Sequence, residues 1–205
     1  MMNSKKVAAF AVAALMVLSA SSVFAASDSE GPFNITAGVN PSFALTADLH
    51  VVNADGTTGA VSPSLAFGNL TNQGGTLKPA STSAAFVALL NAVATDSALT
   101  TPYTITATST ALTSGGNTLP AGACIVTPVY IAADNGGVTD GTLGARNNWI
   151  GARTIYTSTA ARPIRNVRAY FAITDDPAAG STAVVPLSQP SGSYTATTTF
   201  TMTAS

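Results

Sequence analysis

The sequence predicts an all-β protein built as an antiparallel sandwich. Apolar residues recur at every second position in several segments, and turn-forming residues separate these segments at fairly regular spacing. Only 8% of the residues are charged, whereas Thr, Ser, Ala, Gly and Val are abundant. Because side chains alternate across a strand, a period of two places one face in the core and the other in water. Several short strands with turns between them are typical of two packed antiparallel sheets.

The first two dozen residues have the layout of a secretory signal peptide. Lys5 and Lys6 precede an apolar run from Val7 to Leu18, and small side chains lead up to Ala25. The alternative is a membrane anchor, but the apolar run is shorter than the roughly 20 residues that span a bilayer. We therefore expect residues 1–25 to be cleaved, the chain to be exported through the periplasm, and no membrane insertion to follow cleavage.

The remaining chain has the size and charge of one mildly acidic domain. Its roughly 180 residues can bury a single core. Lys78 and five arginines stand against nine acidic residues, so neither nucleic acid nor an anionic membrane is favoured as a partner. Cys124 is the only cysteine, so no intrachain disulfide can form. We expect its thiol to be a small buried hydrophobe.

At the start of this chain, apolar residues alternate with polar or small ones over a short run, residues 33–40. Pro41, which fixes φ and has no N–H to donate, ends the run. The alternation then resumes over residues 43–51 and stops at the turn-forming pair Asp55-Gly56. The two strands are joined end to end without a hairpin, so the first is not expected to fold back onto its own domain. The residues that share its apolar face are Phe33, Ile35, Ala37 and Val39.

We therefore divide the chain into residues 26–41, the arm, and residues 42–205, the domain. Within the domain, residues 194–204 have Tyr, Ala, Thr, Phe, Met and Ala at even positions and only hydroxyl residues at odd ones. That pattern predicts a half-buried strand. Residues 83–94 fit either a helix, through a stripe at i, i+3, i+4 and i+7, or a strand. Further strands are predicted at residues 65–67, 103–107, 123–132 and 167–173.

The residue types needed for catalysis or metal binding are scarce. His50 is the only histidine and falls on the polar phase of a strand, so it favours neither a Ser-His-Asp triad nor a zinc site. The loop at residues 134–141 carries oxygen ligands but lacks the spacing of a calcium-binding EF-hand. We interpret it, and Asp175-Asp176-Pro177, as turns. No catalytic residue, metal or cofactor is predicted.

Five arginines lie within a short span that also contains the only tryptophan, Trp149. One hypothesis is a receptor patch for acidic sugars, because arginine binds carboxylates through two parallel hydrogen bonds. The other, which we favour, is polar contacts at strand edges and between subunits. The three arginines that carry either interpretation are Arg162, Arg165 and Arg168.

The two ends of the chain resemble chaperone–usher pilins. The resemblance rests on the arm GPFNITAGVNP, the following SFALTADLHV and a closing strand that begins Gly-Ser-Tyr-Thr. The nearest type is the colonisation-factor (class 5) fimbrial major subunits, and spore-coat-U-like archaic pilins are the second choice. The similarity covers about the first 30 residues after the predicted leader and about the last 20 residues of the chain, and it is vague between them. Cys124 departs from the cysteine-free colonisation-factor pattern.

The resemblance implies an incomplete immunoglobulin-like β-sandwich that a donated N-terminal strand completes. It implies a fimbrial subunit joined head-to-tail to identical subunits in a helical filament, with a periplasmic chaperone and an outer-membrane usher as assembly partners. It also implies support for adhesion or biofilm formation through a host or surface receptor. The alternatives are a secreted coat or matrix protein and a minor adhesin subunit with a sugar-binding surface. The pocket residues of the donor strand would be Phe33, Ile35, Ala37 and Val39.

Overall fold

The computed structural model describes residues 27–30, 33–37, 43–79, 85–94, 102–137, 140–159 and 164–204. These residues form β-strands joined by turns and three short 3₁₀ helices, and no α-helix occurs among them. The expected all-β class is therefore confirmed. In this part of the chain no helix is long and apolar enough to cross a membrane.

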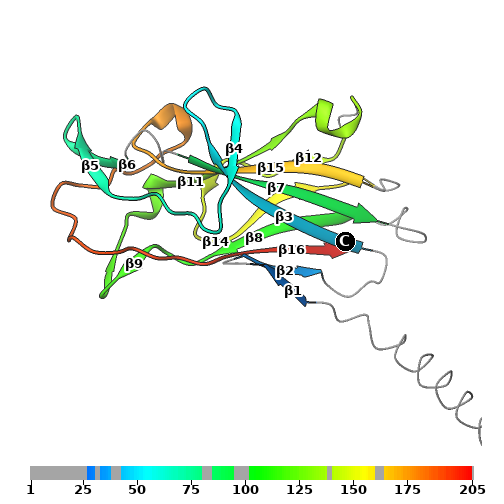
Figure 1. Ribbon diagram of the computed structural model, residues 1–205, viewed down its shortest axis with the longest axis horizontal. Helices are drawn as coiled ribbons and strands as arrows, with labels where there is room; N and C mark the ends of the chain where they lie inside the picture. The colour runs from blue at the N-terminus through cyan, green and yellow to red at the C-terminus, as the bar shows by residue number, and fades with distance from the viewer. Residues whose placement is uncertain are drawn as a thin grey trace, which may run out of the picture.

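Most strands belong to two six-stranded sheets that lie against each other as two layers (Figure 1). The first sheet has the order β1-β2-β16-β8-β14-β12 and the second β13-β11-β15-β7-β3-β4. The strands of the first are β1 (Ser27–Glu30), β2 (Phe33–Ala37), β16 (Thr198–Ala204), β8 (Tyr103–Ser109), β14 (Gly151–Thr157) and β12 (Thr142–Leu143). Those of the second are β13 (Asn147–Asn148), β11 (Cys124–Tyr130), β15 (Ile164–Ile173), β7 (Ala85–Ala94), β3 (Phe43–Val52) and β4 (Thr58–Val61).

Two small hairpins extend from the sandwich. One pairs β5 (Leu70–Gln73) with β6 (Thr76–Pro79), and the other pairs β9 (Thr113–Ser114) with β10 (Asn117–Thr118). The β5–β6 hairpin lies at the end of the molecule far from the C-terminus (Figure 1). The 3₁₀ helices are η3 (Ala121–Ala123), η4 (Ala132–Asn135) and η5 (Pro177–Ala179).

The period of two in the sequence correctly identifies the core faces. In β8 the buried positions alternate, and they include Tyr103, Ile105 and Ala107. In β16 Phe200 and Met202 are buried, as their phase predicts. A continuous core between the two sheets contains these residues together with Leu45 and Leu49 of β3, Phe171 of β15 and Trp149.

The ambiguous segment at residues 83–94 contains a strand, β7, at the centre of the second sheet. It pairs with β15 on one side and β3 on the other. Phe86, Ala88 and Leu90 face the core, while Val87 on the opposite face is also fully buried between its register partners His50 and Tyr170. A central strand that is buried on both faces loses its alternation, which explains why the segment also resembled a helix.

One predicted strand does not form, and another begins later than predicted. Residues 65–67 do not form a strand, because Phe67 turns inward to pack on the rings of Phe86 and Trp149 at centroid distances of 5.1 and 5.5 Å. Gly68, with φ of 65°, follows directly in the left-handed region. The last strand begins at Thr198, and Thr195 before it forms only an isolated bridge to Thr113.

The arm contradicts the expectation that it would not return to its own domain. β2 pairs in parallel with β16, and β1 pairs antiparallel with the other edge of β2. The Cα partners are Phe33 with Thr198, Ile35 with Phe200 and Ala37 with Met202. The proline-separated layout excludes only a hairpin between β2 and β3. It leaves β2 free to join the opposite sheet, which the sequence argument overlooked.

Candidate functional site

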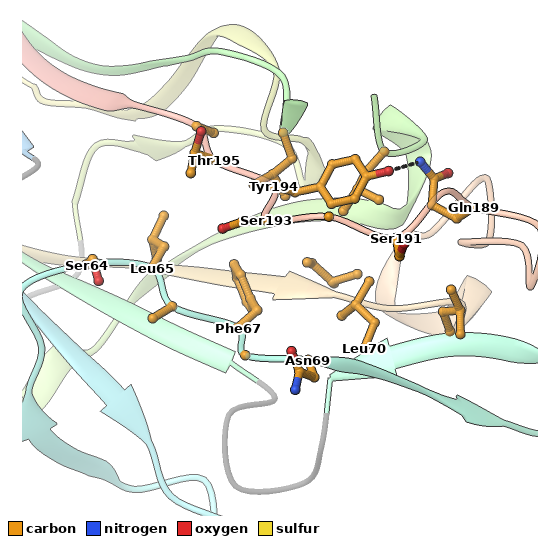
Figure 2. Close-up of a pocket in the computed structure, with 18 of the residues that line it drawn as sticks. Ser64, Leu65, Phe67, Asn69, Leu70, Gln189, Ser191, Ser193, Tyr194 and Thr195 are labelled. Atoms are coloured by element: carbon orange, nitrogen blue, oxygen red, sulfur yellow. Dashed lines mark hydrogen bonds between the residues drawn. The ribbon is translucent and has the colours of Figure 1, made fainter. Parts of the chain in front are cut away.

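The described part of the molecule contains a largely apolar pocket of about 820 Å³. Its two walls are residues 64–70, which connect β4 to β5, and residues 189–196, which lead into β16. Figure 2 shows these two segments running past each other, with Phe67 and Leu70 on one side of the hollow and Tyr194 on the other. Thr198, the first residue of β16, also lines the pocket.

The floor of the pocket is the hydrophobic core itself. Phe67 and Trp149 are stacked, with an angle of 22° between their ring planes, and only 6% and 2% of their surfaces are exposed. Buried Leu112, Leu119 and Ile173 complete the floor. A pocket of this size lined by apolar side chains accepts apolar groups, and its occupancy would remove that surface from water.

Hydrogen bonds hold the second wall in place. The Gln189 side chain donates to the Tyr194 hydroxyl at 2.7 Å (Figure 2), and that hydroxyl donates to the carbonyl of Pro190 at 2.7 Å. Gly192 lies so close to Ser114 that a Cβ at this position would collide with the serine hydroxyl. The wall is therefore an ordered segment that precedes β16 and packs on the β9–β10 hairpin.

The backbone of this wall has one paired side. Thr195 exchanges two N–H···O bonds of 3.0 Å with Thr113, and the carbonyl of Thr197 accepts from the N–H of Thr110 at 3.0 Å. In extended backbone, successive residues direct their N–H and C=O groups to opposite sides. The groups of Tyr194 and Ala196 are therefore directed to the other side, on which β2 lies beside β16.

The pocket and the β2 position together form one site, which we call the edge groove. It is the space along the edge of β16 and of the residues before it, from Met202 back to Gln189. β2 fills the part from Met202 to Thr198, where Phe33 is the last paired residue. The pocket is the remaining part. β2 begins at Phe33, and β1 pairs along its outer edge, so the described part of the arm does not extend into the pocket.

The predicted donor-strand residues fall on this groove in part. Phe33, Ile35 and Ala37 lie in β2, in register with Thr198, Phe200 and Met202, whose side chains are 5%, 0% and 1% exposed. The apolar positions of the arm thus match the inward positions of β16. Val39 lies outside the described residues. The role of all four in a neighbouring subunit stays a prediction.

The arginines are engaged within the chain. Arg165 is 7% exposed as a whole residue and forms two hydrogen bonds, of 2.6 and 2.8 Å, with the Asp140 carboxylate. These bonds raise the pKa of its guanidinium further above its ordinary value. Arg168 forms an ion pair with Asp134 at 2.7 Å. Arg162 lies outside the described residues. Arg165 and Arg168 therefore hold the side chains of Asp140 and Asp134 against β15.

The other polar candidates have structural roles. Nδ1 of His50 is 2.9 Å from the carbonyl of Gly59. Asp176 accepts a hydrogen bond from the N–H of Ala178 and caps η5, while Asp175 pairs with Lys78 at 2.8 Å. Cys124 is fully buried, and burial raises the pKa of its thiol to about 12, which confirms that it is a buried hydrophobe. Within the described ranges, no cluster of His, Cys, Asp and Glu side chains could hold a metal ion.

Sequence reasoning identified the residues of the arm and most of β16 but missed those that line the pocket. Phe67 was assigned to a strand, and Trp149 was grouped with the arginines, although both line the pocket floor. A useful signal was present: a single Trp in a chain of low charge is more often part of the core than of a surface patch. No protein-family model, no curated protein and no solved structure matches this chain.

Proposed function

We propose that the chain is the structural subunit of a bacterial surface pilus, polymerised when the N-terminal arm of one subunit enters the edge groove of the next. The observation that carries the proposal is the β2 position. There β16 pairs with a strand from the far end of the sequence, and an open, largely apolar pocket continues along the same side of the chain segment that leads into β16.

The sheet topology supports an incomplete immunoglobulin-like sandwich. In that fold one sheet has the order A-B-E-D, and the other places strands G, F and C side by side. Here β3-β7-β15-β11 has the first order, and β16-β8 corresponds to F beside C. The G position beside β16 is taken by β2, which precedes the first sandwich strand and runs parallel to β16. A position filled by an arm can be filled equally by the arm of another copy.

The chemistry of the groove suits an extended peptide. Strand addition uses main-chain hydrogen bonds for affinity and alternate side chains in pockets for register. The backbone of Tyr194 and Ala196 is directed to the groove, and Phe67, Leu70 and Trp149 supply an apolar surface. Burying one large apolar side chain contributes roughly 1.5–3 kcal/mol. An arm that covers both parts of the groove therefore gains more free energy from apolar burial and backbone pairing than β2 does over its five paired residues.

The proposed role needs no catalytic residue, metal or cofactor. A head-to-tail contact of this kind does not close on itself, so it generates a filament. In the same proposal a periplasmic chaperone covers the groove before assembly, an outer-membrane usher joins the subunits, and the fibre supports adhesion or biofilm formation.

The proposal is tested with two assembly-defective variants. Deletion of residues 31–40 removes the donor, and Leu70→Arg places a charge in the pocket to block the acceptor. Neither variant should form fibres alone, whereas a mixture should form 1:1 dimers, because the deleted subunit can accept an arm and the Leu70→Arg subunit can donate one. Size-exclusion chromatography with light scattering and electron microscopy would measure both outcomes.

Val184→Arg is the matched control, because Val184 is 43% exposed and lies outside the pocket lining. It should polymerise as the unmodified chain does. A synthetic peptide of residues 26–41 should bind the deletion variant and raise its thermal midpoint, which keeps the test informative where the deletion alone is unstable. Normal fibres from the deletion variant would show that the donor assignment is wrong.

A further inference from the structure

We propose that the arm of a free subunit closes its own edge groove and that this closed monomer is the dormant form, which must release its arm before it can polymerise. This inference rests on the proposed function and concerns the regulation of the same site. Its basis is the pairing of β2 with β16 in a single chain, over five register positions from Phe33–Thr198 to Ala37–Met202.

The direction of β2 follows from its short connection to β3. Only residues 38–42 lie between Ala37 and Phe43, and six Cα–Cα steps span at most about 20 Å. Ala37 must therefore stay close to the start of β3, and in Figure 1 that end of β3 lies beside the C-terminal end of β16. The parallel direction meets this condition, because it pairs Ala37 with Met202 near the C-terminal end of β16. An arm that belongs to another subunit has no such tether.

The pairing of β2 within its own chain should be less stable than the pairing of a donated strand, for two reasons. Parallel pairing is slightly less stable per residue than antiparallel pairing, and the tether favours the parallel direction. The pairing also ends at Thr198, so the pocket with Phe67 and Trp149 on its floor stays open. A donated arm can extend past Thr198 toward Tyr194 and bury this surface, and it can do so in either direction.

The closed form is nevertheless favoured at low concentration because it is intramolecular. A tethered segment has an effective concentration on the order of millimolar. Dilute subunits should thus remain closed, and assembly should begin only where subunits are concentrated or where another protein holds the arm away from the groove. The closed state protects an aggregation-prone edge in the meantime, since an unpaired strand edge is a template for association.

A disulfide lock tests the inference. The double variant Asn34→Cys/Thr199→Cys joins two Cα partners of β2 and β16. Neighbouring strands are about 4.8 Å apart, close to the distance that a disulfide bridges. The native thiol at Cys124 is fully buried in the core and should not interfere. In oxidising buffer the dilute variant should form an intramolecular bond, and the locked monomer should not polymerise at millimolar concentration until a reductant is added.

Non-reducing electrophoresis with intact-mass analysis shows whether the disulfide is intramolecular, and electron microscopy shows whether fibres form. The Asn34→Cys single variant controls for pairing with Cys124, and the unmodified chain controls for assembly. If the unmodified chain forms fibres but the cysteines pair only between subunits, or if the locked monomer polymerises as well as the reduced one, the closed monomer is refuted and the pilus proposal stands. If neither the reduced variant nor the unmodified chain forms fibres, both proposals fail.

Discussion

The ion pair between Asp140 and Arg165 predicts a large loss of stability in Asp140→Asn. Oδ1 of Asp140 accepts from Nε of Arg165 at 2.6 Å, and Oδ2 accepts from a terminal guanidinium nitrogen at 2.8 Å. The Tyr156 hydroxyl donates to the same carboxylate at 3.2 Å. The two charged side chains are only 9% and 8% exposed. The substitution keeps the shape of Asp140 but removes its charge, so the buried Arg165 guanidinium loses the attraction of this carboxylate.

The expected cost is about 3–5 kcal/mol, which is typical when one partner of a buried pair is removed. The chain contains a matched comparison in Asp134 and Arg168. Their atoms approach to 2.7 Å, but the side chains are 30% and 22% exposed. Water screens this second pair, so Asp134→Asn should cost about 0–1 kcal/mol. The contrast between the two variants depends on burial, because the distances are nearly equal.

Urea unfolding followed by circular dichroism measures both free energies, with an unchanged m-value as the check that the native state is intact. The double variant Asp140→Leu/Arg165→Met removes both charges and should recover most of the lost stability, because apolar replacements of a buried ion pair are often neutral or stabilising. The reasoning is refuted if Asp140→Asn loses no more stability than Asp134→Asn.

Two further predictions concern the pocket and the far hairpin. Trp149→Ala should destabilise the domain by about 3–5 kcal/mol, measured by urea unfolding, and weaken binding of the arm peptide, measured by fluorescence titration. Trp149→Phe should lose less stability and less affinity, because a ring still packs on Phe67. The hydrogen bonds of Asp175 with Lys78 and Thr76 lower the pKa of that carboxyl below 3.8. The ionised Asp175 carboxylate should stabilise the fold above its ordinary pKa, and this contribution should be lost as the pH falls through its lower pKa in the folded state. The thermal midpoint of Asp175→Asn should therefore lie below that of the unmodified chain at about pH 5 and approach it at about pH 2.

Local sequence patterns were sufficient for the fold class and for the orientation of most strands. The phases of residues 45–49, 103–107 and 198–202 each assign the correct face to the core, because the period of a strand does not depend on its neighbours. The pattern is less informative for β7, which is central in its sheet and carries mostly apolar residues on both faces. Segment length and β-branched content would have to decide between helix and strand there.

The pocket could not be predicted because it depends on contacts between distant segments. Its walls are residues 64–70 and 189–196, which are more than 100 positions apart and have little regular structure. The aromatic stack of Phe67 on Trp149 links the first of these walls to a third segment, the connection between β13 and β14. The conformation of each loop depends on how its own backbone N–H and C=O groups are hydrogen-bonded. A local sequence pattern therefore does not indicate which other loop packs against it.

The arm also shows that a local pattern cannot identify the partner of a strand. The alternation over residues 33–39 states which side of a strand is apolar, but a strand edge is recognised mainly through its backbone, and every subunit presents an identical edge of β16. The face that fits the groove of a neighbour therefore also fits the groove of its own chain. What separates the two outcomes is the length of the connection to β3, the direction of pairing that it favours and the concentration of other subunits. These are properties of the assembled molecule, so a correct assignment of the apolar face did not determine where the arm would bind.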